Sequence, residues 1–188
     1  MIITNIRLER IFMAFLTLEE VRNKARSNKA YGLESRDILE EQFDSFNINK
    51  TYDIFLSHAF LDAEVIYGLK ITLEEAGFTV YVDWYEDSHL ERGEVTKETA
   101  VVIRKRMQSC KTLIFAITQN SEDSKWMLWE LGYFDGLKDK VAVLGLIENS
   151  GDSFKGQEFL ELYPYVQRYG SIFVLDDPFE FLELWIKR

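Results

Sequence analysis

The sequence contains one cysteine, Cys110, and two histidines, His58 and His89. A single thiol cannot close an intrachain disulfide bond, and it cannot supply a cluster of thiolate ligands to a metal ion. The two histidines are not accompanied by further ligands at metal-binding spacing, so no metal site is expected. The lack of a disulfide framework is typical of a reducing compartment, and we therefore expect a cytoplasmic location.

Long apolar runs and an excess of basic residues are also lacking. The apolar segment 11–16 is short, follows several charged residues and has no small-residue cleavage site, so we interpret it as neither a signal peptide nor a membrane span. The 22 basic residues are outnumbered by 32 acidic ones, which gives a net charge of −10. A field of that sign repels phosphate groups. We therefore expect no nucleic acid and no membrane as a partner, and an anionic small molecule must be held by local donors.

Two nucleotide-binding motifs are missing from the segment 57–62, which follows the first strand-like run. The segment matches neither the G-x-G-x-x-G fingerprint of Rossmann folds nor the phosphate-binding P-loop pattern G-x-x-x-x-G-K-[ST]. A response-regulator receiver is excluded as well, because 57–62 lacks its acidic pair and 176–178 lacks its lysine.

Residues 17–46 carry helical signals and few strand signals. Thr17 and Glu20 have the spacing of a capping box, which predicts a helix that begins at this point. Apolar residues then recur at helical spacing and predict a second helix from about Ser35: Leu39, Phe43 and Phe46. We expect a helical N-terminal extension, residues 1–50, ahead of one main domain, residues 51–188.

From residue 52 onward, apolar strand segments alternate with helical segments. The strand segments are 54–56, 78–82, 113–117, 141–147 and 171–175. This alternation predicts an α/β fold, a flavodoxin-like five-stranded parallel sheet of order 2-1-3-4-5 with helices on both faces. Ligands bind such sheets at the carboxyl ends of the strands, where the strand order switches. The sequence therefore predicts a site built from the loops 57–62, 83–94 and 118–126.

The loops of this predicted site carry polar and aromatic side chains. Ser57 and His58 follow the first strand, and the second loop is long, polar and aromatic. Trp126 and Glu130 lie one turn apart on the helix that follows the third loop. An aromatic ring can hold a flat base, and a carboxylate can stabilise developing positive charge. On spacing alone, a core tryptophan beside an ordinary helix glutamate is the favoured interpretation.

At these three places the sequence resembles the Toll/interleukin receptor (TIR) domain family. Residues 52–58, YDIFLSH, resemble the family's first-strand motif, and 82–93, VDWYEDSHLERG, resemble its BB-loop. Residues 124–130, SKWMLWE, resemble its S-x-W-x-x-x-E signature. The resemblance covers about residues 51–188, and the three motifs occur in the family's order.

The resemblance implies an enzyme that cleaves NAD, with NAD as the substrate and no resident cofactor. In TIR domains of this kind the glutamate of W-x-x-x-E is catalytic, which implies that role for Glu130. The family's substrate contacts carry over to five positions: Ser57, His58, Asp83, Trp84 and Trp126. The chain differs from animal signalling TIR domains in having no proline in the BB-loop.

The helical extension and single TIR domain resemble bacterial free-standing TIR proteins, including the signal-producing subunit of Thoeris antiphage systems. That likeness implies homotypic TIR–TIR self-association, a product that is ADP-ribose or a cyclic ADP-ribose isomer, and a downstream effector that senses this product. Two alternatives remain open. One is a non-catalytic TIR interaction module, and the other is an enzyme like the nucleoside deoxyribosyltransferases, which share the layered fold and a catalytic carboxylate.

Overall fold

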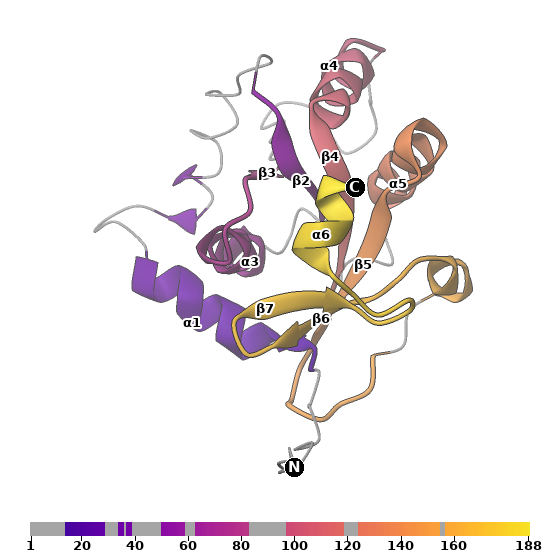
Figure 1. Ribbon diagram of the computed structural model, residues 1–188. Coiled ribbons are helices and arrows are strands. Elements are labelled where there is room, and N and C mark those ends of the chain that lie inside the picture. The colour runs from indigo at the N-terminus through magenta and orange to yellow at the C-terminus, as the bar shows by residue number, and fades with distance from the viewer. Residues whose placement is uncertain are drawn as a thin grey trace, which may run out of the picture.

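The computed structural model shows a parallel sheet between two layers of helices (Figure 1). It describes residues 14–28, 34–35, 37–38, 50–58, 63–82, 97–118, 124–154 and 157–188. In these residues the parallel sheet has five strands in the order β1-β5-β4-β2-β3. The strands are β1 (Leu16–Thr17), β2 (Tyr52–Ser57), β3 (Val80–Val82), β4 (Cys110–Ile117) and β5 (Val141–Ile147). The predicted α/β fold class and the order of its first four strands are confirmed.

Helices cover the two faces of this sheet because the strand side chains alternate between them. They are α1 (Leu18–Asn28), α3 (Ala63–Glu75), α4 (Lys97–Gln108) and α5 (Lys125–Lys138). Ile54 and Leu56 of β2 pack with α1 and α3 in one core cluster. Phe55 of the same strand packs with α4 and α5 in a second cluster. The carboxyl ends of the strands therefore lie between two covered faces, as the sequence predicts.

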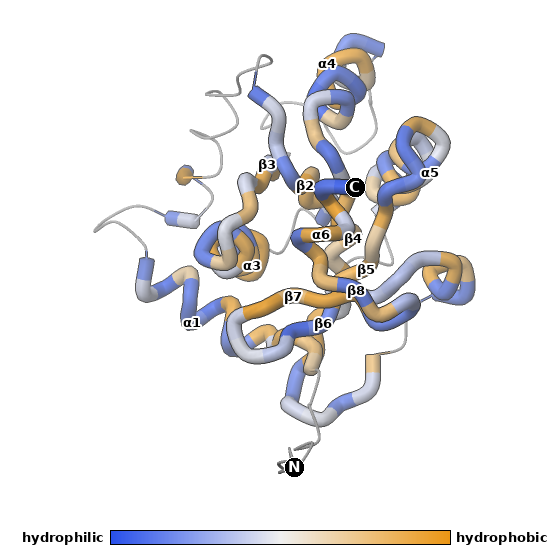
Figure 2. Tube along the Cα trace, in the orientation of Figure 1, coloured by the Kyte–Doolittle hydropathy of each residue, from blue (hydrophilic) through white to orange (hydrophobic). Residues whose placement is uncertain are grey.

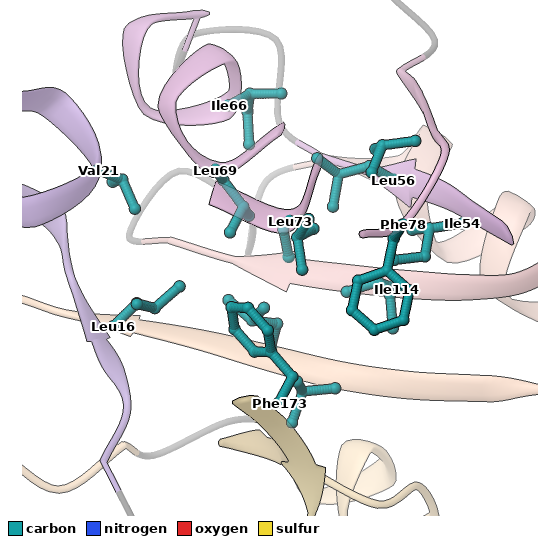
Figure 3. Packing of buried hydrophobic residues seen from close by; sticks show 14 of the residues in the cluster. Leu16, Val21, Ile54, Leu56, Ile66, Leu69, Leu73, Phe78, Ile114 and Phe173 are labelled. Carbon is teal, nitrogen blue, oxygen red and sulfur yellow. The ribbon is translucent and has the colours of Figure 1, made fainter. Parts of the chain in front are cut away.

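The described part of the N-terminal segment belongs to the same core. Thr17 and Glu20 form the predicted capping box: the Thr17 backbone N–H donates to the Glu20 carboxylate, and the Glu20 N–H donates to the Thr17 hydroxyl. Leu16 and Val21 point toward the apolar centre that α3 also faces (Figure 3). The predicted second helix lies mostly outside the described residues, although Ser35, Asp37 and Ile38 are helical.

The fifth position of the sheet differs from the prediction. We expected residues 171–175 there, but β1 pairs with β5 instead. Strand β7 (Ile172–Leu175) forms an antiparallel sheet with β6 (Val166–Tyr169) and β8 (Glu180–Phe181). The chain turns back between β6 and β7 at Gly170, whose φ of 60° suits a tight turn, and a hairpin can only be antiparallel.

The acids and the proline of residues 176–178 are typical of the first turn of a helix and predict that the C-terminal helix begins there. In the structure the helix begins later, because residues 176–179 form a turn that leads into β8. Helix α6 (Leu182–Lys187) follows and buries Leu182, Trp185 and Ile186 against the α3 side of the sheet. A short 3-10 helix, Glu158–Leu162, precedes β6. None of the helices within the described ranges has the length and apolar character that crossing a membrane requires.

Candidate active site

The candidate active site lies at the carboxyl edge of the sheet between β2 and β4. These two neighbouring strands are the first and third of the predicted main domain, so the strand order switches between them. Ser57 is the last residue of β2, and Thr118 directly follows β4. Both side chains are buried although they are polar. A crevice for ligands is expected at this place in an open α/β sheet.

Helix α5 presents one face to this edge. The helix starts after Ser124, whose hydroxyl accepts the backbone N–H of Met127 at 3.4 Å and so caps the first turn. The buried stripe of the helix follows helical spacing and consists of Met127, Glu130, Leu131 and Phe134. An acid thus occupies a position at which the helix pattern calls for an apolar side chain.

Ser57 and Glu130 lie in direct contact although 73 residues separate them in sequence. The Ser57 hydroxyl donates a hydrogen bond of 2.6 Å to Oε2 of Glu130. The Glu130 side chain is only 3% exposed, and Ser57 is 1% exposed. A buried carboxylate is costly unless it is hydrogen-bonded, and such groups concentrate at functional sites. Glu130 is therefore not an ordinary solvated helix glutamate.

His58 lies next to this pair at the end of β2. Its ring is half-buried, and Nδ1 lies 3.2 Å from the Leu56 carbonyl oxygen. When Nδ1 carries the proton, this contact is a hydrogen bond that fixes the ring against its own strand. The imidazole is thereby held at the carboxyl edge of the sheet.

Trp126 belongs to an aromatic column of partly buried rings on α5, which pack against the second core cluster. Its ring stacks on Trp129 with a centroid separation of 4.6 Å, and Trp129 stacks on Tyr133 at 5.7 Å. The guanidinium of Arg104, from α4, lies 5.4 Å from the Trp129 ring centroid and 5.6 Å from that of Tyr133. The column holds Trp126 in place through its neighbours along the helix.

The remaining predicted contacts, Asp83 and Trp84, lie outside the described residues, as do most of the second and third loops. Their roles stay predictions. Among the residues that the structure does describe, no group of three or more His, Cys, Asp or Glu side chains is arranged to hold a metal ion.

The structure brings two of the predicted site residues together, Ser57 and Glu130, and it shows a contact between them that the sequence did not predict. Each was singled out for its own motif, since spacing along a chain says nothing of pairs 73 residues apart. The signal for the contact was present: a serine ends a buried strand, and an acid stands in the buried stripe of a facing helix.

No protein-family model matches the chain. Curated proteins similar to it include one from Bacillus cereus (strain MSX-D12) named "Probable 3' cyclic ADP-D-ribose synthase ThsB'". It is 57% identical over 135 residues, which cover 71% of this chain and 70% of that protein. Another, from Cytobacillus dafuensis, is named "Putative cyclic ADP-D-ribose synthase TIR2". It is 34% identical over 137 residues, which cover 64% of this chain and 36% of that protein.

Proposed function

This chain belongs to the TIR-domain family of the Thoeris type, and from that premise we propose that it cleaves the nicotinamide–ribose bond of NAD. The observation that carries the proposal is the position of Glu130. Its carboxylate lies at the switch point of the sheet, is almost fully buried and accepts a hydrogen bond from Ser57. The similar proteins named as cyclic ADP-ribose synthases support a nucleotide substrate at this site.

The chemistry follows from the charge of the substrate. When the bond between the ribose C1′ and the nicotinamide nitrogen breaks, its electron pair goes to that nitrogen, and nicotinamide leaves as a neutral molecule. Positive charge then develops on the ribose ring as an oxocarbenium ion, and a carboxylate beside the ring stabilises that charge, as in glycoside cleavage. No strong general acid is needed, because the leaving group is already cationic in NAD. Glu130 supplies the carboxylate in this proposal.

The product depends on which group captures the oxocarbenium ion. Attack by water, with loss of a proton, gives ADP-ribose. Attack by a group of the ADP-ribosyl moiety itself, with loss of a proton when that group is a hydroxyl, gives cyclic ADP-ribose or an isomer of it. We propose cyclisation as the principal outcome, because two similar proteins are named as cyclic ADP-D-ribose synthases. The cyclic product then serves as a signal in antiphage defence that a separate effector protein senses.

Self-association is part of the proposal. Glu130 is 3% exposed, so NAD reaches it only after a rearrangement at the carboxyl edge of the sheet. The TIR–TIR self-association that the family resemblance implies supplies a cause for such a rearrangement. We therefore expect the rate per protein molecule to rise with protein concentration, and a rate per molecule that stays constant over a hundredfold range contradicts this part.

Incubating the purified protein with NAD tests the function. We expect release of nicotinamide together with a product of the mass of cyclic ADP-ribose, separated from linear ADP-ribose by chromatography. Absence of nicotinamide release at all protein concentrations favours a non-catalytic interaction module. Cleavage of deoxynucleosides in preference to NAD favours an enzyme like the nucleoside deoxyribosyltransferases.

A further inference from the structure

The end of β2 is a rigid part of the molecule. Strand β2 lies inside the sheet, with β3 on one side and β4 on the other. Ser57 is in register with Phe115 of β4, and the preceding residue, Leu56, is paired on both sides. A backbone held in two ladders and buried on both faces has little freedom to move. The Ser57 hydroxyl is thus carried by the end of a well-fixed strand.

The Glu130 carboxylate must be held in one orientation by a contact with a fixed part of the molecule. A glutamate side chain has three rotatable bonds, and catalytic groups must be held to within about 0.5 Å of their working position. The helix fixes the Glu130 backbone through its capped first turn and its buried stripe. The 2.6 Å hydrogen bond from Ser57 adds a contact at the carboxylate itself, beyond the fixed backbone of the helix.

We propose that Ser57 is a positioning residue that orients the Glu130 carboxylate, rather than a contact to the substrate. This inference rests on the proposed function of Glu130 and assigns Ser57 a different role from the one that the family resemblance implies. The two side chains come from adjacent layers, Ser57 from the sheet and Glu130 from a covering helix. Both are buried where they meet.

The hydrogen-bond capacity of the two groups supports this role. A serine hydroxyl has one proton to donate, and in the structure it is directed to Oε2 of Glu130. That contact takes up the Ser57 proton, so the hydroxyl has no second proton to donate to a substrate. A bond of this charge-assisted kind is also stronger than one between neutral groups.

The two roles predict different kinetics. A residue that binds the substrate equally in the ground state and the transition state changes KM, whereas a residue that orients the catalytic carboxylate changes kcat. Loss of one hydrogen bond to a charged group corresponds to about tenfold to hundredfold in rate. We therefore expect Ser57→Ala to lower kcat for nicotinamide release by about that factor, with KM for NAD within about threefold of the wild type.

The experiment compares Ser57→Ala, Ser57→Cys and Glu130→Gln with a matched control, Thr112→Val. Thr112 is also buried and hydrogen-bonded, but its hydroxyl donates to the Lys140 carbonyl at the opposite end of the sheet. The control therefore shows how far the loss of a buried hydroxyl alone, away from the site, changes the stability and kcat of the protein. Cysteine has nearly the shape of serine, but its thiol is a weaker hydrogen-bond donor than a hydroxyl. Ser57→Cys should therefore have a kcat between those of the wild type and Ser57→Ala. Thermal unfolding of each variant shows that it is folded.

The outcomes separate the inference from the proposed function. If Glu130→Gln retains the wild-type rate, the proposed function itself fails. If Glu130→Gln is inactive while Ser57→Ala keeps the kcat of Thr112→Val, or raises KM at unchanged kcat, Ser57 is not a positioning residue although the function stands. A kcat below that of Ser57→Ala for a folded Ser57→Cys also overturns the inference.

Discussion

Asp53 shows how a residue of the first-strand motif can serve the fold instead of the chemistry. Its carboxylate accepts hydrogen bonds from the backbone N–H and the hydroxyl of Thr79, at 2.9 and 2.8 Å. It also pairs with Lys111 at 2.8 Å. Thr79 directly precedes β3 and Lys111 belongs to β4, so Asp53 joins the strands on both sides of β2. Its place at the amino end of β2 is far along the strand from Ser57.

The pKa of Asp53 makes this role measurable. Burial raises the pKa, but the hydrogen bonds from Lys111 and Thr79 outweigh burial and hold it below its usual value of 3.8. A lowered pKa in the folded state stabilises the fold above the usual value, and this contribution is lost as the pH falls through the folded value. We expect Asp53→Asn to reduce the free energy of unfolding by about 1–2 kcal/mol at pH 7. The difference from the wild type, measured by urea unfolding, should shrink below about pH 4, and a constant difference down to pH 2 contradicts this account.

At the scale of elements, the aromatic column joins α4 to α5. Trp126, Trp129 and Tyr133 recur at i, i+3 and i+7 along α5, and Arg104 of α4 lies against two of the three rings. This stripe runs beside the buried stripe that carries Glu130. The column therefore links the packing of α4 to the helix that positions the carboxylate.

We expect Trp129→Leu to reduce the free energy of unfolding by about 1–3 kcal/mol, because two ring stacks and one cation–π contact are lost together. Arg104→Gln, which removes only the cation, should reduce the free energy of unfolding by about 1 kcal/mol or less. Because Trp129 supports Trp126, the KM for NAD should rise in Trp129→Leu and stay near the wild-type value in Arg104→Gln. Equal effects of both variants on stability, measured by urea unfolding, would show that the rings do not act as a column.

The elements also show what could be predicted from the sequence. The capping box at Thr17 and the helix α5 could be predicted from the sequence, because their signals lie in neighbouring residues. The placement of β7 in an antiparallel sheet could not be predicted, because an apolar run looks the same in a parallel sheet and in a hairpin. The two-residue strand β1 is too short to leave a periodic signal. The Ser57–Glu130 bond was hidden for another reason, since it joins two elements whose distance only the fold decides.

At the scale of the whole molecule, α1 packs on the domain through few apolar residues. Figure 2 shows it as a mostly hydrophilic helix, and its buried residues are Leu18, Val21 and Ala25. It crosses α3 at Gly68, where an added Cβ would lie 1.8 Å from the Val21 carbonyl oxygen. Ion pairs such as Arg26–Glu64 surround the crossing but contribute little when exposed. The closeness of the two backbones at Gly68 therefore decides how α1 docks.

We expect Gly68→Ala to destabilise the fold by about 2 kcal/mol or more, because α1 and α3 must separate to admit the methyl group. Gly132→Ala is the matched control, since it also lies in a helix but has no atom within 4 Å of its added Cβ. This control should stabilise the protein by about 0.5–1 kcal/mol. Thermal unfolding checks both, and an equal gain from the two substitutions would mean that α1 is not docked at Gly68. The division into a helical extension, residues 1–50, and a main domain, residues 51–188, stays a prediction.

The central claim is that a buried carboxylate at the carboxyl edge of the sheet drives the cleavage of NAD. Nicotinamide release by Glu130→Gln, compared with the wild type and with Glu183→Gln, tests it most directly. Glu183 is a control because its side chain is 65% exposed and lies on the C-terminal helix. We predict a loss of about 10²–10³-fold for Glu130→Gln and no change for Glu183→Gln. A rate for folded Glu130→Gln within about threefold of the wild type, well short of the loss expected for an essential electrostatic group, would contradict the account.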